Sequence, residues 1–296
     1  MLWYHYLLIG LAAALVLLIA ILLIRAAMFN DKTDYYKKVD VNFKHDDVVY
    51  KLGECLKIKT VSHEDVSLTD FSKFQEYIDK VKGFYPLVFS KCEFNQTKEY
   101  AIKLKLKGKS DAKPTVLMAH YDVVPVTEGW DHDPFLGEVV DGYLYGRGAI
   151  DTKCTMICAL SALEKALEDN YVPENDLYLC FGANEEIYGD SQVKIVEELK
   201  AQGIKPALVF DEGGGITQKA FPGVVEDTAF LGVVEKGMCN VKLSIDGNGG
   251  HSSTPRKNGP TIQLARALDQ LEKHPMKPKF TRTTLKMVDK IGRAHV

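Results

Sequence analysis

The sequence has no CxxC pair, no long run of basic residues, and no Lys or Arg ahead of its first apolar segment. Its six cysteines are scattered and mostly sit in apolar context, which is typical of buried free thiols and leaves the redox compartment open. Charges of both signs are intermixed and sum to a formal net charge of −3, so neither a nucleic-acid partner nor a strongly anionic ligand is indicated. What remains is ordinary globular composition, 46% hydrophobic and 26% charged, over 296 residues, a length that predicts about two domains.

One long apolar segment is present, and it lies at the amino terminus. Residues 7–24 are uninterrupted apolar sequence with aromatic residues at one edge and Arg25 at the other, which predicts a single transmembrane helix. A cleaved signal peptide is the main alternative, although such peptides have shorter apolar cores and a positively charged leader, and a buried core helix is a third. We therefore expect a membrane anchor over residues 1–29 and a polar linker over residues 30–45. The basic residues after the span favour a cytoplasmic globular part, but the side of the membrane stays open.

A short apolar run in the middle of the chain ends in two polar residues. Residues 116–118 precede His120 and Asp122, the pattern of a buried strand that carries polar residues at its carboxyl end, where open α/β sheets usually place their chemistry. Because side chains alternate along a strand, the two share one face, so the carboxylate can hold an imidazole whose other nitrogen binds a metal. On its own a His-x-Asp pair is a weak motif, and a capped strand with a hydrogen-bonded histidine is the commoner explanation.

Acidic residues close three further apolar runs, in alternating strand and helix order. Taken singly, Asp151 is equally explained as a helix N-cap, and the adjacent Glu185 and Glu186 as a solvated loop. A parallel sheet, however, collects the ends of its strands on one edge, so residues far apart in the sequence converge there. One imidazole and several carboxylates, without cysteine, form a ligand set for hard or borderline divalent ions, and an Asp able to bridge suggests two of them. The acids concerned are Asp151, Glu185, Glu186 and Asp211.

Five ordered motifs in this chain resemble those of the M20 family of zinc metallopeptidases. The resemblance covers about residues 46–274 and, together with the predicted anchor, points to the membrane-anchored carboxypeptidase S-like branch of the family. It implies an α/β fold with a mostly parallel sheet and helices on both faces, like that of di-zinc aminopeptidases and carboxypeptidases, with an inserted smaller α+β lid domain. The motifs are His120-Tyr-Asp-Val-Val-Pro125, Gly146-Arg-Gly-Ala-Ile-Asp151, Asn184-Glu-Glu186, Asp211-Glu-Gly213 and Gly249-Gly-His-Ser-Ser-Thr-Pro255.

The resemblance also implies a ligand set for two divalent metal ions, Zn²⁺ in the first place with Co²⁺ and Mn²⁺ as alternatives. Asp151 would bridge the two ions. His120 and Asp211 would complete one of them, and Glu186 would serve the other, together with a histidine that comes late in the family's chain.

Three further residues receive roles in catalysis from the same resemblance. Asp122 would orient the histidine ligand, and Glu185 would be the general base for a metal-activated water. His251, in the lid, would hydrogen-bond the developing oxyanion or the substrate carboxylate. The family often has a second Asp followed by Lys-Gly after the bridging acid, whereas this chain has Thr152-Lys153-Cys154. Because that second Asp is not expected to be a ligand, the difference does not alter the predicted metal site.

The implied function is hydrolysis of an amide bond in small peptides with release of the C-terminal amino acid. An N-acyl amino acid deacylase is the alternative enzyme, and a non-enzymatic peptide-binding protein on the same fold is the third hypothesis. A homodimer through the lid is a further implied option.

The predicted domain plan follows the family as well. We expect the first segment of a catalytic domain over residues 46–235, an incomplete lid over residues 236–290 and a non-native tail over residues 291–296. The family's late zinc histidine and its substrate-carboxylate arginine would lie beyond this chain, so we expect weak or no activity from the chain alone.

Overall fold

The chain forms two compact units, Lys38–Glu212 and a second that combines Met1–Lys37 with Gly213–Val296. The predicted linker, apart from His45, lies outside the described residues, as do residues 295–296 of the predicted tail. The predicted limits of the catalytic and lid domains stay predictions. The computed structural model describes residues 2–28, 45–222, 224, 227–251, 253–254 and 257–294.

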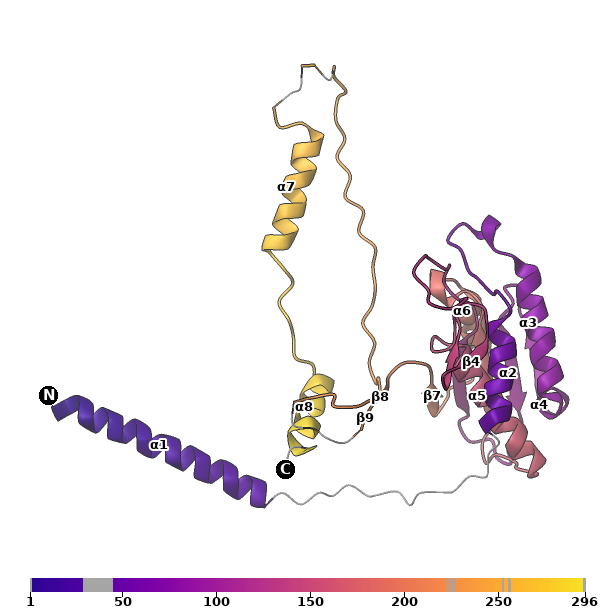
Figure 1. Cartoon of the computed structure of the whole chain (residues 1–296), viewed down its shortest axis with the longest axis horizontal. Coiled ribbons are helices and arrows are strands. Elements are labelled where there is room, and N and C mark those ends of the chain that lie inside the picture. The colour runs from indigo at the N-terminus through magenta and orange to yellow at the C-terminus, as the bar shows by residue number, and fades with distance from the viewer. Residues whose placement is uncertain are drawn as a thin grey trace. The chain divides into compact units, whose positions relative to one another are not determined.

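The unit Lys38–Glu212 is built on a five-stranded sheet in the order β1-β2-β6-β3-β7. Figure 1 labels strand β7 of this sheet and the helices α2 to α6 of the same unit. The central strand β3 (Thr115–His120) runs parallel to β6 (Leu177–Gly182) and to β7 (Leu208–Phe210). The other half is antiparallel: β2 (Ile102–Leu106) pairs with β6, and β1 (Glu93–Gln96) pairs with β2. The predicted α/β fold is confirmed, and its parallel part consists of the strands whose ends carry the predicted site.

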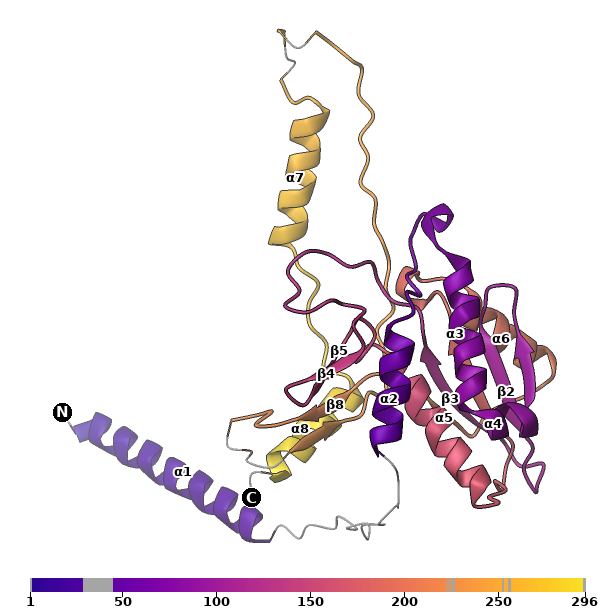
Figure 2. The same ribbon diagram turned by 45° about the vertical axis from the view of Figure 1, so that its right-hand side comes forward.

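Helices cover both faces of this sheet (Figure 2). Leu179 and Phe181 of β6 face a core formed with α2, α3, α4 and α5, whereas the alternate residues Tyr178 and Cys180 face α6. The expected two-sided covering is therefore present. The helices are α2 (His45–Leu56), α3 (Phe71–Phe84), α4 (Pro86–Lys91), α5 (Lys153–Glu168) and α6 (Ser191–Ala201).

Helix α3 anchors the end of strand β3 from one side of the sheet. Its N-cap is Asp70, which accepts a hydrogen bond from the backbone N–H of Ser72 at 3.0 Å. The apolar stripe of the helix buries Tyr77, whose ring stacks on Tyr121 with the ring centres 4.8 Å apart. Tyr121 directly follows β3, and its hydroxyl donates to the carbonyl of Tyr100 at 2.6 Å. This packing fixes the chain at the point where the polar residues of the site begin.

Short elements connect the main strands and helices of this unit. Strands β4 (Glu138–Val140) and β5 (Tyr143–Tyr145) form an antiparallel pair ahead of the glycine-rich turn that leads to α5. Two 3-10 helices, η1 (Val66–Leu68) and η2 (Glu185–Ile187), precede α3 and follow β6. Strand β7, at one end of the sheet order, exposes all three of its apolar side chains.

The second unit contains the amino-terminal helix α1 (Leu2–Ala27). Its residues Trp3–Ala27 are long and apolar enough to cross a membrane, as the sequence predicts. Strands β8 (Gly215–Thr217) and β9 (Thr228–Phe230) form an antiparallel pair.

The predicted lid range, residues 236–290, carries helix α7 (Pro260–Lys273) and most of α8 (Arg282–Ala294). Strands were expected in this range as well, but none is present in its described residues. Residues 231–250 have no regular secondary structure and are almost entirely exposed, so no neighbouring backbone pairs with them there. Helix α8 also runs through residues 291–294 of the predicted tail.

Candidate metal centre

His120 is the last residue of β3 and is only 1% exposed. Its Nδ1 lies 3.1 Å from the backbone oxygen of Asp122 and 3.3 Å from Oδ1 of the same residue. Its Nε2 lies 3.0 Å from Oδ1 of Asp151, which precedes α5. The imidazole is thus held through one nitrogen and presents the other to a carboxylate.

Several carboxylates converge on Nε2 of His120. The nearest oxygens belong to Asp151 at 3.0 Å, Glu212 at 3.3 Å and Glu185 at 3.7 Å. His120, Asp151 and Glu186 form one group whose potential ligand atoms all lie within 4.8 Å of one another, and His120, Glu185 and Glu212 form a second. The ends of β3, β6 and β7 and the turn before α5 therefore meet around one imidazole.

In the described part of the chain His120 is the basic side chain that these acids face, and no Lys or Arg balances them. Within the described ranges, none of them forms an ion pair with Lys or Arg, and the buried Oε2 of Glu212 accepts no hydrogen bond. Burial, with the nearby charge of Asp151, raises the pKa of Glu186 to about 7. Burial also raises the pKa of Glu185. Oxygen ligands with one imidazole are a donor set for a divalent cation, which would supply the missing positive charge.

The protonation of His120 is set by the same surroundings. Burial lowers the pKa of His120, but the facing carboxylates of Asp122 and Glu212 outweigh that effect and raise it to about 11. A metal binds only the neutral imidazole, so a cation at this site would take the place of a proton.

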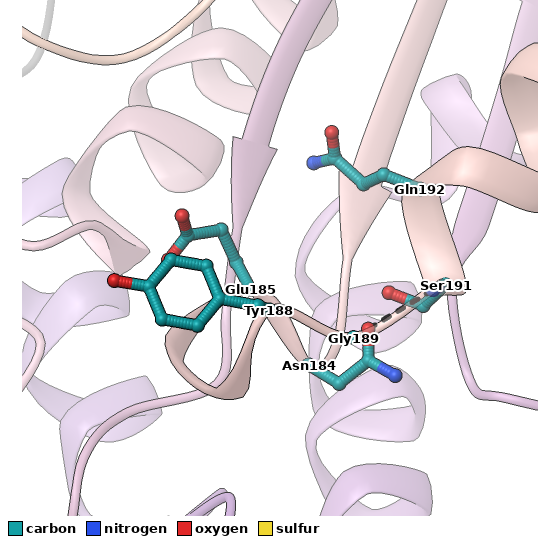
Figure 3. A pocket seen from close by; sticks show the side chains of 6 residues that line it. All are labelled: Asn184, Glu185, Tyr188, Gly189, Ser191 and Gln192. Atoms are coloured by element: carbon teal, nitrogen blue, oxygen red, sulfur yellow. Dashed lines mark hydrogen bonds between the residues drawn. The ribbon is translucent and has the colours of Figure 1, made fainter. Parts of the chain in front are cut away.

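A tight turn at the end of β6 brings the two adjacent glutamates to the same imidazole. The turn is the 3-10 helix η2, and it ends at Tyr188, which has a left-handed backbone (φ 52°). A pocket of about 300 Å³ lies beside Glu185, and its lining includes Tyr188 and Gln192 (Figure 3). One predicted acid therefore borders a space large enough for a small ligand.

The carboxylate of Asp122 is fully buried and holds this turn as well as the histidine. Its oxygens accept hydrogen bonds from the backbone N–H groups of Glu185 at 3.1 Å and Glu186 at 3.2 Å. The hydroxyl of Ser62 donates to Oδ2 at 2.8 Å. Sequence reasoning missed Ser62, because it lies 60 positions from its partner in a segment without a recognisable motif.

The end of β7 differs from the sequence prediction. Asp211, the predicted ligand, is exposed and belongs to neither group around the imidazole, whereas the next residue, Glu212, belongs to one of them. The carboxylate of Asp211 instead accepts the backbone N–H of Glu212 at 2.9 Å. Two consecutive acids after a strand point in different directions, and the sequence identifies the pair without saying which member turns inward. The metal role of Asp211 stays a prediction, with Glu212 as its competitor.

His251 belongs to the other compact unit of the chain. Within its own unit it is exposed, and its Nδ1 lies 2.7 Å from the hydroxyl of Ser253. Its predicted role toward a substrate stays a prediction.

Comparison with known proteins provides independent evidence. A family model described as Peptidase family M20/M25/M40 matches residues 116–287. An N-fatty-acyl-amino acid synthase/hydrolase of Danio rerio is 37% identical over 78% of this chain and 45% of its own length. A probable carboxypeptidase S-like protein of Dictyostelium discoideum is 33% identical over 83% of this chain and 49% of its own length. The chain thus spans about half the length of the curated relatives it matches.

Solved structures resemble the chain as well. The M20 family metallo-carboxypeptidase Sso-CP2 from Sulfolobus solfataricus shares 24% identity at a TM-score of 0.47, covering 57% of this chain and 38% of that one. The family match itself extends from β3 into α8 and includes more than half of the residues. The chain therefore belongs to peptidase family M20/M25/M40.

Proposed function

We propose that this protein is a metal-dependent hydrolase that cleaves an amide bond in small peptides and releases the C-terminal amino acid. The observation that carries the proposal is the convergence of carboxylates from two strand ends and one turn on Nε2 of a buried histidine, with no Lys or Arg paired to them among the described residues. Membership of a metallopeptidase family supports the enzyme class and a divalent metal. The number and identity of the ions, the roles of the residues and the substrate are our proposals.

In this proposal the site would hold two Zn²⁺ ions, with Asp151 as their shared ligand. His120 and Asp211 would complete one ion, with Glu212 as the competing ligand, and Glu186 would serve the other. The short distances that link Asp151 to both His120 and Glu186 support the bridging role. When bound, the ions would polarise the scissile carbonyl and lower the pKa of a water molecule.

Glu185 acts as the general base in this scheme. It accepts the proton of the attacking water and returns it to the leaving amine. Its position supports the role, because Oε2 lies 3.7 Å from Nε2 of His120 and the side chain borders the pocket of about 300 Å³. Its raised pKa, caused first by burial, makes the carboxylate a better proton acceptor near neutral pH. Asp122 keeps the ring of His120 oriented, and His251 contacts the substrate's oxyanion or carboxylate.

A second candidate is hydrolysis of N-acyl amino acids. It is favoured by the 37% identical relative that is named an N-fatty-acyl-amino acid synthase/hydrolase. Both reactions break an amide bond to an α-amino acid, so the same residues would serve either. The difference lies in the group on the carbonyl side, which is an amino acid in one case and an acyl chain in the other.

Turnover of matched substrates separates the two candidates. The complete gene product, loaded with Zn²⁺, would be assayed with Gly-Leu, N-acetyl-leucine and N-oleoyl-leucine, with the Glu185→Gln variant as control. Preference for the dipeptide supports the peptidase, and preference for either acyl substrate supports the deacylase. If the enzyme holds zinc but Glu185→Gln hydrolyses its substrate as fast as the wild type, the assigned mechanism is wrong. Binding of the peptides without any turnover would favour the non-enzymatic hypothesis.

We further propose that helix α1 anchors the protein in a membrane by a single pass. The support is its length and apolar composition. Small peptides or N-acyl amino acids are the proposed partners of the site, and a homodimer through the lid is proposed as the assembly.

A further inference from the structure

The carboxylate of Asp122 connects three separate parts of the metal centre. Oδ1 lies 3.3 Å from Nδ1 of His120 and accepts the N–H of Glu185 at 3.1 Å. Oδ2 accepts the N–H of Glu186 at 3.2 Å and the hydroxyl of Ser62 at 2.8 Å. One side chain therefore holds the histidine and the turn with both glutamates, and its own orientation determines theirs.

Ser62 is itself rigidly held. It is 1% exposed, and its N–H donates to the carbonyl of Val123 at 3.0 Å. The N–H of Val123 in turn donates to the carbonyl of Thr60 at 2.9 Å, and the neighbouring Val61 forms a parallel bridge with Val123. The segment thus lies along the chain that leaves β3. The hydroxyl of Ser62 also lies 3.4 Å from the carbonyl oxygen of Ala183, just before the turn that carries Glu185 and Glu186.

We propose that Ser62 is a positioning residue that fixes the rotation of the Asp122 carboxylate and, through it, the histidine and the two glutamates of the metal centre. The catalytic meaning of this role rests on the proposed function, but the contacts do not. Of the four groups named around this carboxylate, two are backbone amides of the turn that it has to hold, and a third is the histidine that it orients. The hydroxyl of Ser62 is the only one of the four that comes from outside the metal centre.

Removal of this hydroxyl has a specific consequence. The carboxylate loses one of the two donors to Oδ2 and can rotate about its last side-chain bond, which weakens its hydrogen bonds to the turn and the ring together. Changes to the outer-shell partners of a metal ligand commonly cost about 10–100-fold in metal affinity or activity. Because Ser62 acts through Asp122 and not on His120 directly, we expect a loss of zinc affinity of about tenfold, the low end of that range.

Three variants of the full chain, purified in detergent, test the proposal. Ser62→Ala removes the hydroxyl, whereas Ser62→Thr keeps a hydroxyl at a position that borders a cavity of about 340 Å³. Ser161→Ala is the matched control, because this serine is also buried (6% exposed) and its hydroxyl lies 2.7 Å from that of Tyr85 in the helical core. The first measurement is zinc affinity by competition with a chelator. The second is hydrogen–deuterium exchange of residues 183–190 in the metal-free protein.

We expect Ser62→Ala to bind zinc about tenfold more weakly and to exchange faster at the glutamate turn, whereas Ser62→Thr and Ser161→Ala resemble the wild type in both measurements. If Ser62→Ala and Ser161→Ala had equal effects, Ser62 would have only a general stabilising role, and the inference would be overturned. Failure of Ser62→Thr to restore both values, while it unfolds at the wild-type temperature, would overturn it too. A wild-type chain that binds no zinc would refute the proposed function, whereas the exchange measurement would still decide the role of Ser62.

Discussion

At the scale of single residues, Asp151 is the acid whose oxygen lies nearest to Nε2 of His120. Its Oδ1 lies 3.0 Å from Nε2 of His120, and its charge helps raise the pKa of Glu186. We expect Asp151→Asn to weaken zinc binding by more than about 100-fold, since a loss of that size already follows from changes in outer-shell partners. Isothermal titration calorimetry with Zn²⁺ measures this loss of affinity. Asp131→Asn, in an exposed loop, is the control and should bind as the wild type does.

The pKa of Glu186 makes the stability of the metal-free protein depend on pH. Burial first, and then Asp151, raises this pKa from an ordinary 4.5 to about 7. Between these pH values the folded protein holds a proton that the unfolded chain has released. The contribution of Glu186 to the free energy of unfolding is therefore largest below pH 4.5 and falls as the pH rises to 7. Thermal unfolding in a chelator should show this fall, and Glu186→Gln should flatten it. A melting temperature of the wild type that rises over the same range more steeply than that of the variant would contradict the assignment.

At the scale of elements, the glycine-rich turn before α5 determines where Asp151 lies. Gly148 has a φ of +91°, and a Cβ on it would come within 2.9 Å of Val123 and 3.2 Å of Lys153. Gly129 has a similar φ of +97°, but a Cβ there would meet nothing within 4 Å. Alanine at either position should cost about 1–3 kcal/mol through backbone strain.

Only Gly148→Ala should also displace the turn, so we expect weaker zinc binding from Gly148→Ala and unchanged binding from Gly129→Ala. Chelator competition and chemical unfolding on the same samples separate affinity from stability. If the two alanine variants lose zinc affinity to the same extent, the turn does not position the ligand.

The elements also explain how far the sequence alone could lead. Apolar runs that end in His120, Asp151 or Glu185 are local signals, and parallel strands bring such ends together whatever the rest of the chain does. The inward member of the Asp211-Glu212 pair was not predictable, because strand alternation no longer fixes a side chain beyond the strand's end. Ser62 carries no local signal, since its partner lies far away in the sequence.

The antiparallel pairing of β1 with β2, and of β2 with β6, could not be predicted from the sequence either. Which strand adds to which edge of a sheet depends on the helices that pack there, and not on the pattern within the strand. The strands expected in the lid came from family resemblance alone, and the regular secondary structure in the described part of that range is helical.

At the scale of the whole molecule, the apolar helix and the metal centre belong to different compact units. Deletion of residues 1–29 should therefore remove the chain from membranes and leave its zinc affinity within about twofold, because both groups of potential ligands around His120 belong to the unit Lys38–Glu212. Flotation with liposomes measures the first effect, and chelator competition measures the second. A shortened chain that still floats with lipid would refute anchoring by α1, and one that no longer binds zinc would show that the units depend on each other.

Strand β7 has a practical consequence for anyone who handles this protein. Leu208, Val209 and Phe210 are each about half exposed, and β3 is the strand's one sheet neighbour among the described residues. An exposed apolar strand at the edge of a sheet is a template with which the backbone of a second molecule can form hydrogen bonds. Concentrated preparations should therefore aggregate with time, and the Val209→Lys variant should aggregate less. Light scattering measures the aggregation of both.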